Sequence, residues 1–459
     1  MTSAKLKILR RLKKILPGEI IFDSAALKNY SGDKWFAAHQ PDAVALPRST
    51  KSIAAILRFA NQNKIPVTAR GGGYGYVGGC VPVRGGIVLS LERMNRILEI
   101  NAKDFVAVVQ PAVITEKFQA AVEKLNLFYP PDPASRAHNF IGGNIATNAG
   151  GPRCLKYGVT REYVLGLEVV LANGKIVRVG GRTHKNKTGF DLTKLFVGSE
   201  GLLGIVAEAT LKLIPLPPFR ATLALGFGSM KNAVGALQAI LAAGFLPGAL
   251  ELADEFTLAA AAKYTRSQSL GVCKAHLIVE IDGQKNSVFS ELPEVEKVIG
   301  KYKPFFVERG FGNLECEKIW QVRREFSTAL KVTGLTKLNE DIVVPRGKLE
   351  ELFKFTSRLQ KKFNLPIACF GHAGDGNIHV NVMVDETQPG ARARCDQVLD
   401  ELFRQVIAWN GAITGEHGIG LAKKRWWPLA VSKEARELHQ TLKTALDPEG
   451  ILNPGKFLD

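Results

Sequence analysis

The sequence lacks paired cysteines. Six cysteines occur, and no two of them have the CxxC spacing: Cys80, Cys154, Cys273, Cys316, Cys369 and Cys395. The chain therefore lacks the ligand pattern of an iron–sulfur cluster or a zinc ribbon, and reduced thiols are expected. Any electrons that this protein collected would have to leave through a partner or a diffusible acceptor.

The sequence also lacks long hydrophobic runs. No stretch approaches the roughly 18 uninterrupted apolar residues that a membrane-spanning helix needs. The N-terminus shows neither the apolar core nor the small-residue cleavage site of a secretory signal. We therefore expect a soluble, cytoplasmic protein.

Acidic residues are missing before Pro17, where six basic residues occur. In this predicted N-terminal helical segment, residues 1–40, leucines recur on one helical stripe at Leu6, Leu9, Leu12 and Leu16. The pattern favours an ordinary first helix packed on its own domain. The alternative is peripheral contact with the inner face of a membrane.

The chain has 459 residues, enough for two or three domains, and a formal net charge of +18. Such a charge is typical of proteins that bind nucleic acid, an anionic membrane surface or small anions. A protein that bound polyanions through charge alone would do so in a salt-sensitive way. Because no nucleic-acid recognition motif is present, we expect no nucleic-acid partner and favour small anions.

Three glycine-rich blocks precede a proline cluster at residues 215–218. They cover residues 70–79, 130–151 and 197–206. Glycines expose successive backbone N–H groups without side-chain obstruction, which suits a pyrophosphate. Each glycine also costs backbone entropy on folding, so one extended cofactor explains the three blocks better than three independent surface turns.

The hydrophobic periodicity changes at the proline cluster. Before it, the pattern predicts a helix at residues 51–63 and short strands at 65–69, 86–90 and 105–109. After it, the pattern predicts a strand at 275–281 and helices at 233–243 and 346–363. We therefore expect mixed α and β structure before the boundary and an α+β domain after it.

Two histidines flank a glycine-rich turn within residues 370–382. After the turn, apolar and polar residues alternate, which places His379 and Asn381 on one face of a strand. A second polar motif, residues 414–418, contains Glu416. Two imidazoles and a carboxylate can form a divalent-metal site with open positions, and Glu416 is the natural third ligand.

With the glycine blocks, the histidine motifs and the terminal motif at residues 453–456, the sequence resembles a known family. These are flavoproteins of the vanillyl-alcohol oxidase/para-cresol methylhydroxylase type, in the branch of D-lactate dehydrogenase, the glycolate oxidase D-subunit and D-2-hydroxyglutarate dehydrogenase. The resemblance begins near Pro41 and implies an α+β fold. It implies a two-subdomain FAD-binding domain (PCMH type) at 41–217, a cap domain with an antiparallel sheet at 218–410, and a segment at 411–459 that returns to the active site and the FAD domain.

The resemblance implies non-covalent FAD, because Tyr74 stands where some relatives carry a histidine bound to the flavin. It places the cofactor on the three glycine blocks and the terminal motif. The implied FAD-binding residues are Arg70, Gly71, Gly72, Gly73, Tyr74, Gly75, Pro131, Gly142, Gly143, Asn144, Ala146, Thr147, Gly150, Glu200, Gly204, Ile205 and Asn453.

The resemblance also implies a metal site and a base. His372, His379 and Glu416 would bind a divalent metal, which we expect to be zinc. His417 would take the proton from the substrate hydroxyl, since imidazole titrates near neutral pH. A metal on that hydroxyl would lower its pKa and assist hydride transfer from the neighbouring carbon to flavin N5.

A 2-hydroxy acid also needs its carboxylate held, and a guanidinium does this with two parallel hydrogen bonds. By resemblance, Arg323 binds the substrate and takes part in catalysis, with Ser327 one helical turn later and Asn381 as further contacts. The family's substrate lysine aligns less clearly. Counting back from the following proline reaches Asn339, whereas Lys337, our candidate, lies two residues earlier.

These features predict an enzyme that uses FAD to oxidise a small D-2-hydroxy acid to the 2-keto acid. The glycolate, D-lactate and D-2-hydroxyglutarate classes all stay open, as does a homodimer. Electrons would pass to an external acceptor, for which an iron–sulfur or other redox subunit is a candidate by family analogy. The alternative is a flavin-dependent non-redox transferase resembling alkyl-glycerone-phosphate synthase.

Overall fold

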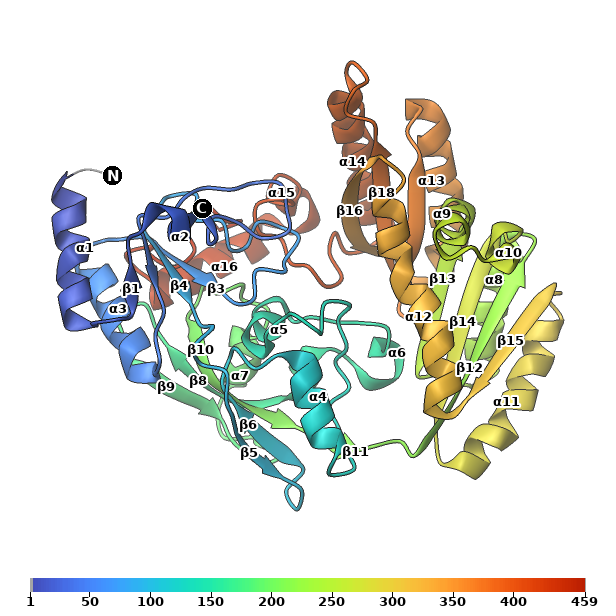
Figure 1. Cartoon of the computed structure of the whole chain (residues 1–459), viewed down its shortest axis with the longest axis horizontal. Coiled ribbons are helices and arrows are strands. Elements are labelled where there is room, and N and C mark those ends of the chain that lie inside the picture. The colour runs from blue at the N-terminus through green and yellow to red at the C-terminus, as the bar shows by residue number, and fades with distance from the viewer. Residues whose placement is uncertain (1–2, 459) are drawn as a thin grey trace. The chain divides into compact units, whose positions relative to one another are not determined.

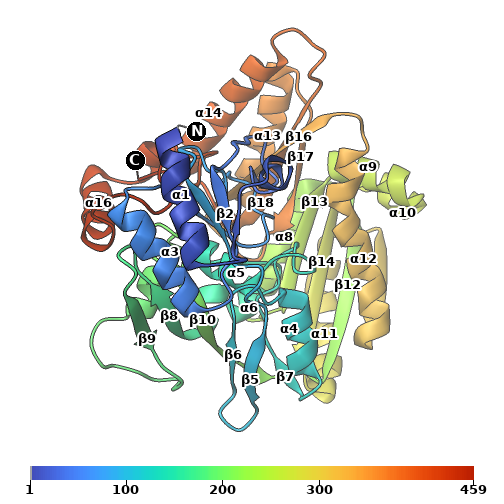
Figure 2. The same cartoon turned by 60° about the vertical axis from the view of Figure 1, so that its left-hand side comes forward.

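The computed structural model describes residues 3–458, with side chains from residue 7 onward. The described chain divides into two compact units (Figures 1 and 2). Unit 1 contains the described residues up to Ala149, Val159–Leu216 and the stretch from Glu416 onward. Unit 2 contains Gly150–Gly158 and Pro217–Gly415. The chain thus leaves unit 1 at the proline cluster and returns to it at Glu416.

The first sheet of unit 1 has the strand order β1-β2-β4-β3. β4 pairs in parallel with β2 and β3, whereas β1 is antiparallel to β2. The strands are β1 (Ile20–Ile21), β2 (Ala43–Ala45), β3 (Val67–Arg70) and β4 (Ile87–Ser90). The helices around this sheet are α1 (Ser3–Ile15), α2 (Ser24–Lys28) and α3 (Thr50–Gln62).

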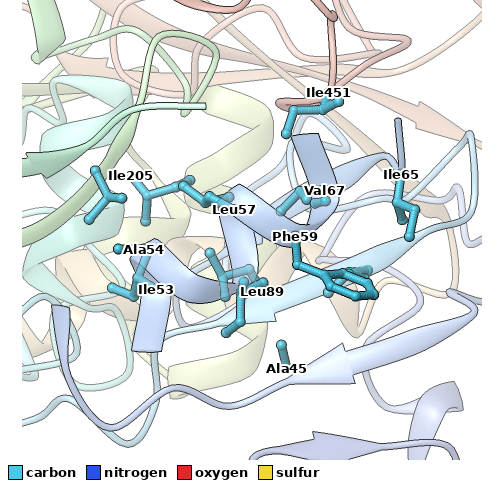
Figure 3. Packing of buried hydrophobic residues seen from close by; sticks show 14 of the residues in the cluster. Ala45, Ile53, Ala54, Leu57, Phe59, Ile65, Val67, Leu89, Ile205 and Ile451 are labelled. Carbon is cyan, nitrogen blue, oxygen red and sulfur yellow. The ribbon is translucent and has the colours of Figure 1, made fainter. Parts of the chain in front are cut away.

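The hydrophobic core beside this sheet combines residues from distant parts of the sequence. Leu9 and Leu12 of α1 are fully buried in it, as predicted for a first helix packed on its own domain. The side chain of Leu6 lies outside the described residues. Figure 3 shows Leu57 of α3 together with Ile451 from the C-terminal stretch. Both ends of the described chain therefore contribute to one core.

The second sheet of unit 1 is antiparallel, with the order β5-β6-β10-β8-β9. Its strands are β5 (Ile97–Asn101), β6 (Val106–Val109), β8 (Val164–Val170), β9 (Ile176–Gly180) and β10 (Ile205–Lys212). A small ribbon pairs β7 (Leu127–Phe128) with β11 (Ile214–Pro215). The remaining helices of unit 1 are α4 (Thr115–Glu123), α5 (Ile141–Thr147), η1 (Thr160–Tyr163), α7 (Leu192–Phe196), α15 (Trp427–Ala430) and α16 (Lys433–Leu446).

Unit 2 is built on a seven-stranded antiparallel sheet with the order β15-β12-β14-β13-β17-β18-β16. The strands are β12 (Phe219–Phe227), β13 (Ala249–Asp254), β14 (Ala275–Gly283), β15 (Phe306–Phe311), β16 (Thr336–Val343), β17 (Ile367–His372) and β18 (Asn377–Val384). Helices α9 and α12 pack together over one face, and α8, α11, α13 and α14 cover the other (Figure 1). The helices of unit 2 are α6 (Cys154–Tyr157), α8 (Met230–Ala242), α9 (Glu255–Thr265), α10 (Gln268–Gly271), α11 (Lys285–Gly300), α12 (Gly312–Lys331), η2 (Arg346–Lys348), α13 (Leu349–Phe363) and α14 (Ala391–Ala408).

The mixed α+β class with antiparallel sheets is confirmed, and four predicted elements begin later than expected. The strands predicted at 86–90 and 105–109 begin one residue later, at Ile87 and Val106. The strand predicted at residues 65–69 begins at Val67, because Pro66 has no N–H to donate to a ladder. The helix predicted at 346–363 opens with the 3-10 turn η2 before α13 begins. Among the helices of the described residues, none combines the length and the apolar character needed to cross a membrane.

Candidate active site

The first two glycine blocks meet in unit 1 with their backbones in close approach. A Cβ on Gly72 would lie 2.9 Å from the carbonyl oxygen of His138, and one on Gly71 would lie 3.6 Å from Cα of Gly143. The rings of Tyr74 and His138 stack, with centroids 4.9 Å apart. A larger residue than glycine at position 72 would push these loops apart, so the close approach requires glycine at this position.

The third glycine block joins the second through backbone hydrogen bonds. The amide of Gly198 donates to the carbonyl of Ile145 at 2.9 Å, and that of Glu200 donates to Ala146 at 2.8 Å. The predicted FAD-binding residues of all three blocks therefore lie in one region of unit 1, with one exception. Gly150 belongs to the short stretch that is grouped with unit 2.

Several predicted FAD-binding residues make contacts within the protein itself. Asn144 is buried and donates from Nδ2 to the hydroxyl oxygen of Thr115 at 2.7 Å. Gly204 allows close packing, since a Cβ there would lie 2.6 Å from a methyl group of Val169. Ile205 is part of the hydrophobic core. These three residues shape the loops from within.

Glu200 is a partly buried residue whose carboxylate holds the chain just after His417. Its carboxylate oxygens accept from the amides of Ile419 at 2.7 Å and Gly420 at 2.9 Å. Burial raises the pKa of Glu200, and these two amide hydrogen bonds oppose that rise. The carboxylate thus positions the C-terminal stretch.

The terminal motif links the first and third glycine blocks. The side chain of Asn453 accepts from the amide of Ala69 at 2.7 Å and donates to the carbonyl of Glu200 at 2.5 Å. The ammonium of Lys456, which is 2% exposed, donates to the carbonyls of Gly78 and Val81. Asn453, predicted to bind FAD, therefore stabilises the loops that carry the other predicted FAD-binding residues.

In unit 2, β17 and β18 carry the first histidine motif on the sheet face that α9 and α12 cover. The antiparallel register pairs Phe370 with His379 and Ala368 with Asn381, so His379 and Asn381 share one face, as predicted. The turn between the strands requires glycine at position 376. Its φ is +86°, and a Cβ there would lie 2.1 Å from the carbonyl oxygen of Val344.

The predicted metal ligands come together. Ligand atoms of His372, His379 and Glu416 all lie within 4.8 Å of one another. Glu416 directly follows Gly415, whose amide donates to the buried carboxylate of Asp341 at 2.8 Å. Two imidazoles and one carboxylate are a donor set that suits zinc and leaves further positions open, so these residues fit a divalent metal.

Glu251, which sequence reasoning missed, connects the histidine motif to Arg323. It is 1% exposed on β13, with Oε1 2.6 Å from Nδ1 of His372. Its Oε2 accepts from Nε of Arg323 at 2.7 Å and lies 2.6 Å from Nη2. Burial raises the pKa of Glu251, but His372 and Arg323 outweigh it, and the pKa is lowered overall. An acidic residue between Leu250 and Leu252 in an apolar strand was the available signal.

The other predicted substrate residues lie on α12 and the neighbouring strands. The ammonium of Lys337 donates to the hydroxyl of Ser327 at 2.7 Å. Burial, with a contribution from Lys331, lowers the pKa of Lys337 to about 8. Asn381 donates from Nδ2 to the carbonyl of Ala368 at 3.1 Å, and its buried Oδ1 has no hydrogen-bond partner within residues 3–458. Of the two positions that counting left open, Lys337 is therefore the one beside Ser327.

His417, the predicted base, lies in unit 1 beside an aromatic residue that the sequence did not single out. Its ring centroid is 5.2 Å from that of Tyr76 in the first glycine block. Burial raises the pKa of Tyr76. The phenol of Tyr76 therefore stays protonated and neutral at physiological pH next to this imidazole.

The glycine blocks of unit 1 and the fold define this chain as a flavoprotein of the FAD-dependent oxidoreductase class. The family described as "FAD binding domain" matches residues 41–180, and "FAD linked oxidases, C-terminal domain" matches residues 216–457. The chain belongs to this family of FAD-linked oxidases, in the branch that its sequence resembles.

Curated relatives match nearly the whole chain. The glycolate oxidase subunit GlcD of Bacillus subtilis (strain 168) is 40% identical over 96% of this chain and 92% of the relative. A D-lactate dehydrogenase of Archaeoglobus fulgidus is 35% identical over 90% of this chain and 91% of the relative. A D-2-hydroxyglutarate dehydrogenase of Stutzerimonas stutzeri is 32% identical over 96% of both chains.

Solved structures with low sequence identity share the fold. A p-cresol methylhydroxylase with bound substrate superimposes with a TM-score of 0.82 at 20% identity, covering 100% of this chain and 98% of the other. An alkyldihydroxyacetonephosphate synthase gives a TM-score of 0.77 at 20% identity, covering 98% and 85%. At this identity, the likeness shows the fold alone.

Proposed function

We propose that this protein uses non-covalent FAD to oxidise a small D-2-hydroxy acid to the corresponding 2-keto acid. The observation that carries the proposal is the convergence of His372, His379 and Glu416, with Arg323 linked to His372 through Glu251. The names of the relatives, which include glycolate oxidase and D-lactate dehydrogenase, support the substrate class. Glycolate, D-lactate and D-2-hydroxyglutarate are the first candidates.

The cations on α12 and β16 would hold the substrate as an anion. Arg323 retains donors on Nη1 beyond those engaged by Glu251, and these can bind a carboxylate. Lys337 and Ser327 would bind a further oxygen of the substrate. Asn381, with its buried Oδ1, would contact the hydroxyl group. These residues give orientation, which is a large part of the rate enhancement in such reactions.

His372, His379 and Glu416 would hold the divalent metal, for which we propose zinc, and His417 would act as the base. When bound, the metal lowers the pKa of a hydroxyl group in contact with it. His417 then takes the proton from the hydroxyl as the C–H bond at the same carbon breaks. The FAD of this family supplies an acceptor for the hydride at N5.

We propose that residues 41–217 bind FAD, that 218–410 carry the substrate residues, and that 411–459 supply Glu416 and His417. The relatives named as glycolate oxidase subunits support a partner subunit as the electron acceptor. An iron–sulfur subunit is our first candidate. Peripheral attachment at the inner face of a membrane and a homodimer are compatible with this arrangement.

Anaerobic flavin reduction tests the proposal. Purified FAD-loaded protein is mixed with D- and L-2-hydroxy acids, and bleaching of flavin absorbance is followed with and without a chelator. We expect D-enantiomers or glycolate to bleach the flavin and the chelator to slow the reaction. Wild-type reduction rates in His372→Ala would show that the metal assignment is wrong, and no bleaching by any hydroxy acid would contradict the function.

The same measurement separates the proposal from its alternative. A flavin-dependent transferase, such as the alkyldihydroxyacetonephosphate synthase that shares this fold, performs no net redox reaction on a hydroxy acid. Its flavin would stay oxidised throughout the panel. The relatives at 30–40% identity named as oxidases and dehydrogenases favour the redox function.

A further inference from the structure

Glu251 contacts two residues of the proposed site, and each of its carboxylate oxygens faces a different one. Oε1 lies 2.6 Å from Nδ1 of His372. Oε2 accepts from Nε of Arg323 at 2.7 Å. We propose that Glu251 is a positioning residue that holds the metal-binding histidine and the substrate-binding arginine together. This inference rests on the proposed function and adds to it the residue that couples its two halves.

For His372, the carboxylate decides which ring nitrogen is available to a metal. A neutral imidazole carries one N–H, and a carboxylate 2.6 Å from Nδ1 fixes that proton on Nδ1. The lone pair of Nε2 is then left for the metal. A carboxylate partner also makes the imidazole a more basic ligand, and loss of such partners typically weakens metal affinity about 10–100-fold.

For Arg323, the same carboxylate fixes the direction of the guanidinium. The side chain of Arg323 is 12% exposed, and its guanidinium carbon lies 4.8 Å from the ring centroid of Phe370. Glu251 engages Nε and Nη2, so the planar group cannot rotate without breaking both contacts. An arginine held in this way presents its remaining donors to a carboxylate in one orientation.

A second buried carboxylate on the same sheet face provides a matched control. Glu280 on β14 is 2% exposed and accepts from Arg220 at 3.0 Å, Thr222 at 3.0 Å and Trp320 at 2.6 Å. It thus resembles Glu251 in burial and in having an arginine partner. None of these three partners belongs to the proposed metal or substrate residues.

The experiment compares zinc binding by FAD-loaded Glu251→Gln, Glu280→Gln and His372→Ala, using competition with a chromophoric chelator. An amide has one acceptor oxygen, so Glu251→Gln can satisfy His372 or Arg323 but not both. We expect its zinc dissociation constant to rise about 10–100-fold. At saturating zinc, the KM for the hydroxy acid should also rise, because Arg323 loses its anchor. Glu280→Gln should keep wild-type values for both, and His372→Ala should lose zinc.

Histidine nitrogen NMR on metal-free wild-type protein gives a readout that needs no substitution. We expect the proton of His372 on Nδ1. A proton on Nε2 would overturn the proposal, as would wild-type zinc affinity in Glu251→Gln when His372→Ala has lost the metal. Zinc retained by His372→Ala would instead contradict the metal assignment of the proposed function, and the position of the proton would still decide the role of Glu251.

Discussion

Lys337 is a partly buried cation whose charge depends on pH within the working range of an enzyme. Burial disfavours its ammonium form, and Lys331 adds repulsion, so its pKa falls to about 8. Its one hydrogen bond in the described residues, to Ser327, is to a neutral group. Among the side chains described, from residue 7 to residue 458, no carboxylate pairs with Lys337 in the way that Glu251 pairs with Arg323.

We expect the affinity for an anionic substrate to fall as the pH rises through about 8. Below that pH Lys337 is charged and attracts the anion, whereas at pH 9 only about one-tenth of it is protonated. The KM should therefore rise about tenfold between pH 7 and pH 9. Steady-state kinetics across this range test the prediction, and Lys337→Gln should remove the pH dependence. A KM in the wild type that does not change with pH would contradict it.

The sequence was enough to select His372, His379 and Glu416 as candidate metal ligands. Histidine and glutamate are common metal ligands, and these three lie in two short polar motifs that can be recognised in the sequence. The role of Glu251 was not predictable in this way. It depends on β13 pairing with β17, where Leu252 lies opposite Gly371, and these residues are far apart in the sequence. Sequence periodicity reports only the neighbours within one element.

At the scale of elements, the terminal motif holds the first glycine block in place through hydrogen bonds. Lys456 donates to the carbonyls of Gly78 and Val81. Its positive charge also lowers the pKa of two partly buried carboxyls, Asp33 and Glu200, against the rise caused by their desolvation. Removing a buried donor leaves its acceptors without a hydrogen bond, which costs about 1–3 kcal/mol for each acceptor.

Lys456→Met should therefore weaken FAD retention. Without the ammonium the segment at residues 71–81 loses two hydrogen bonds, and we expect FAD to dissociate at least about tenfold more readily, equivalent to about 1.4 kcal/mol. Release of flavin fluorescence on dilution measures this. Lys433→Met, which removes an exposed lysine on α16, is the control and should retain FAD. Equal retention of FAD in both variants would show that Lys456 does not contribute to FAD binding.

The hydrophobic periodicity of the sequence predicted helix α3 and the alternation of side chains between the two faces of β18. It did not predict the residues at which some helices and strands begin. Pro66 delayed the start of β3, and a 3-10 turn precedes α13. The packing of Ile451 with Leu57 and Val67 could not be foreseen, because nothing local to the C-terminal stretch indicates which sheet it joins.

For the molecule as a whole, the net charge of +18 should favour the capture of anions. Screening shortens the range of this attraction, since the Debye length is about 10 Å at 0.1 M salt and about 3 Å at 1 M. We expect the second-order rate constant for flavin reduction by the hydroxy acid to fall several-fold between these conditions. The first-order rate at saturating substrate should change little. Stopped-flow measurements at both salt concentrations test this, and a salt-independent second-order rate constant would contradict it.

The return of the chain to unit 1 has a consequence for biogenesis. A nascent chain that has emerged only as far as Gly450 contains all of unit 2 but lacks the core residues Ile451 and Leu452 of unit 1, together with Asn453 and Lys456. Domains generally fold as units during synthesis. Because unit 1 is completed only after unit 2 has been synthesised, we expect its core to close late, and stable flavin binding to follow at that stage.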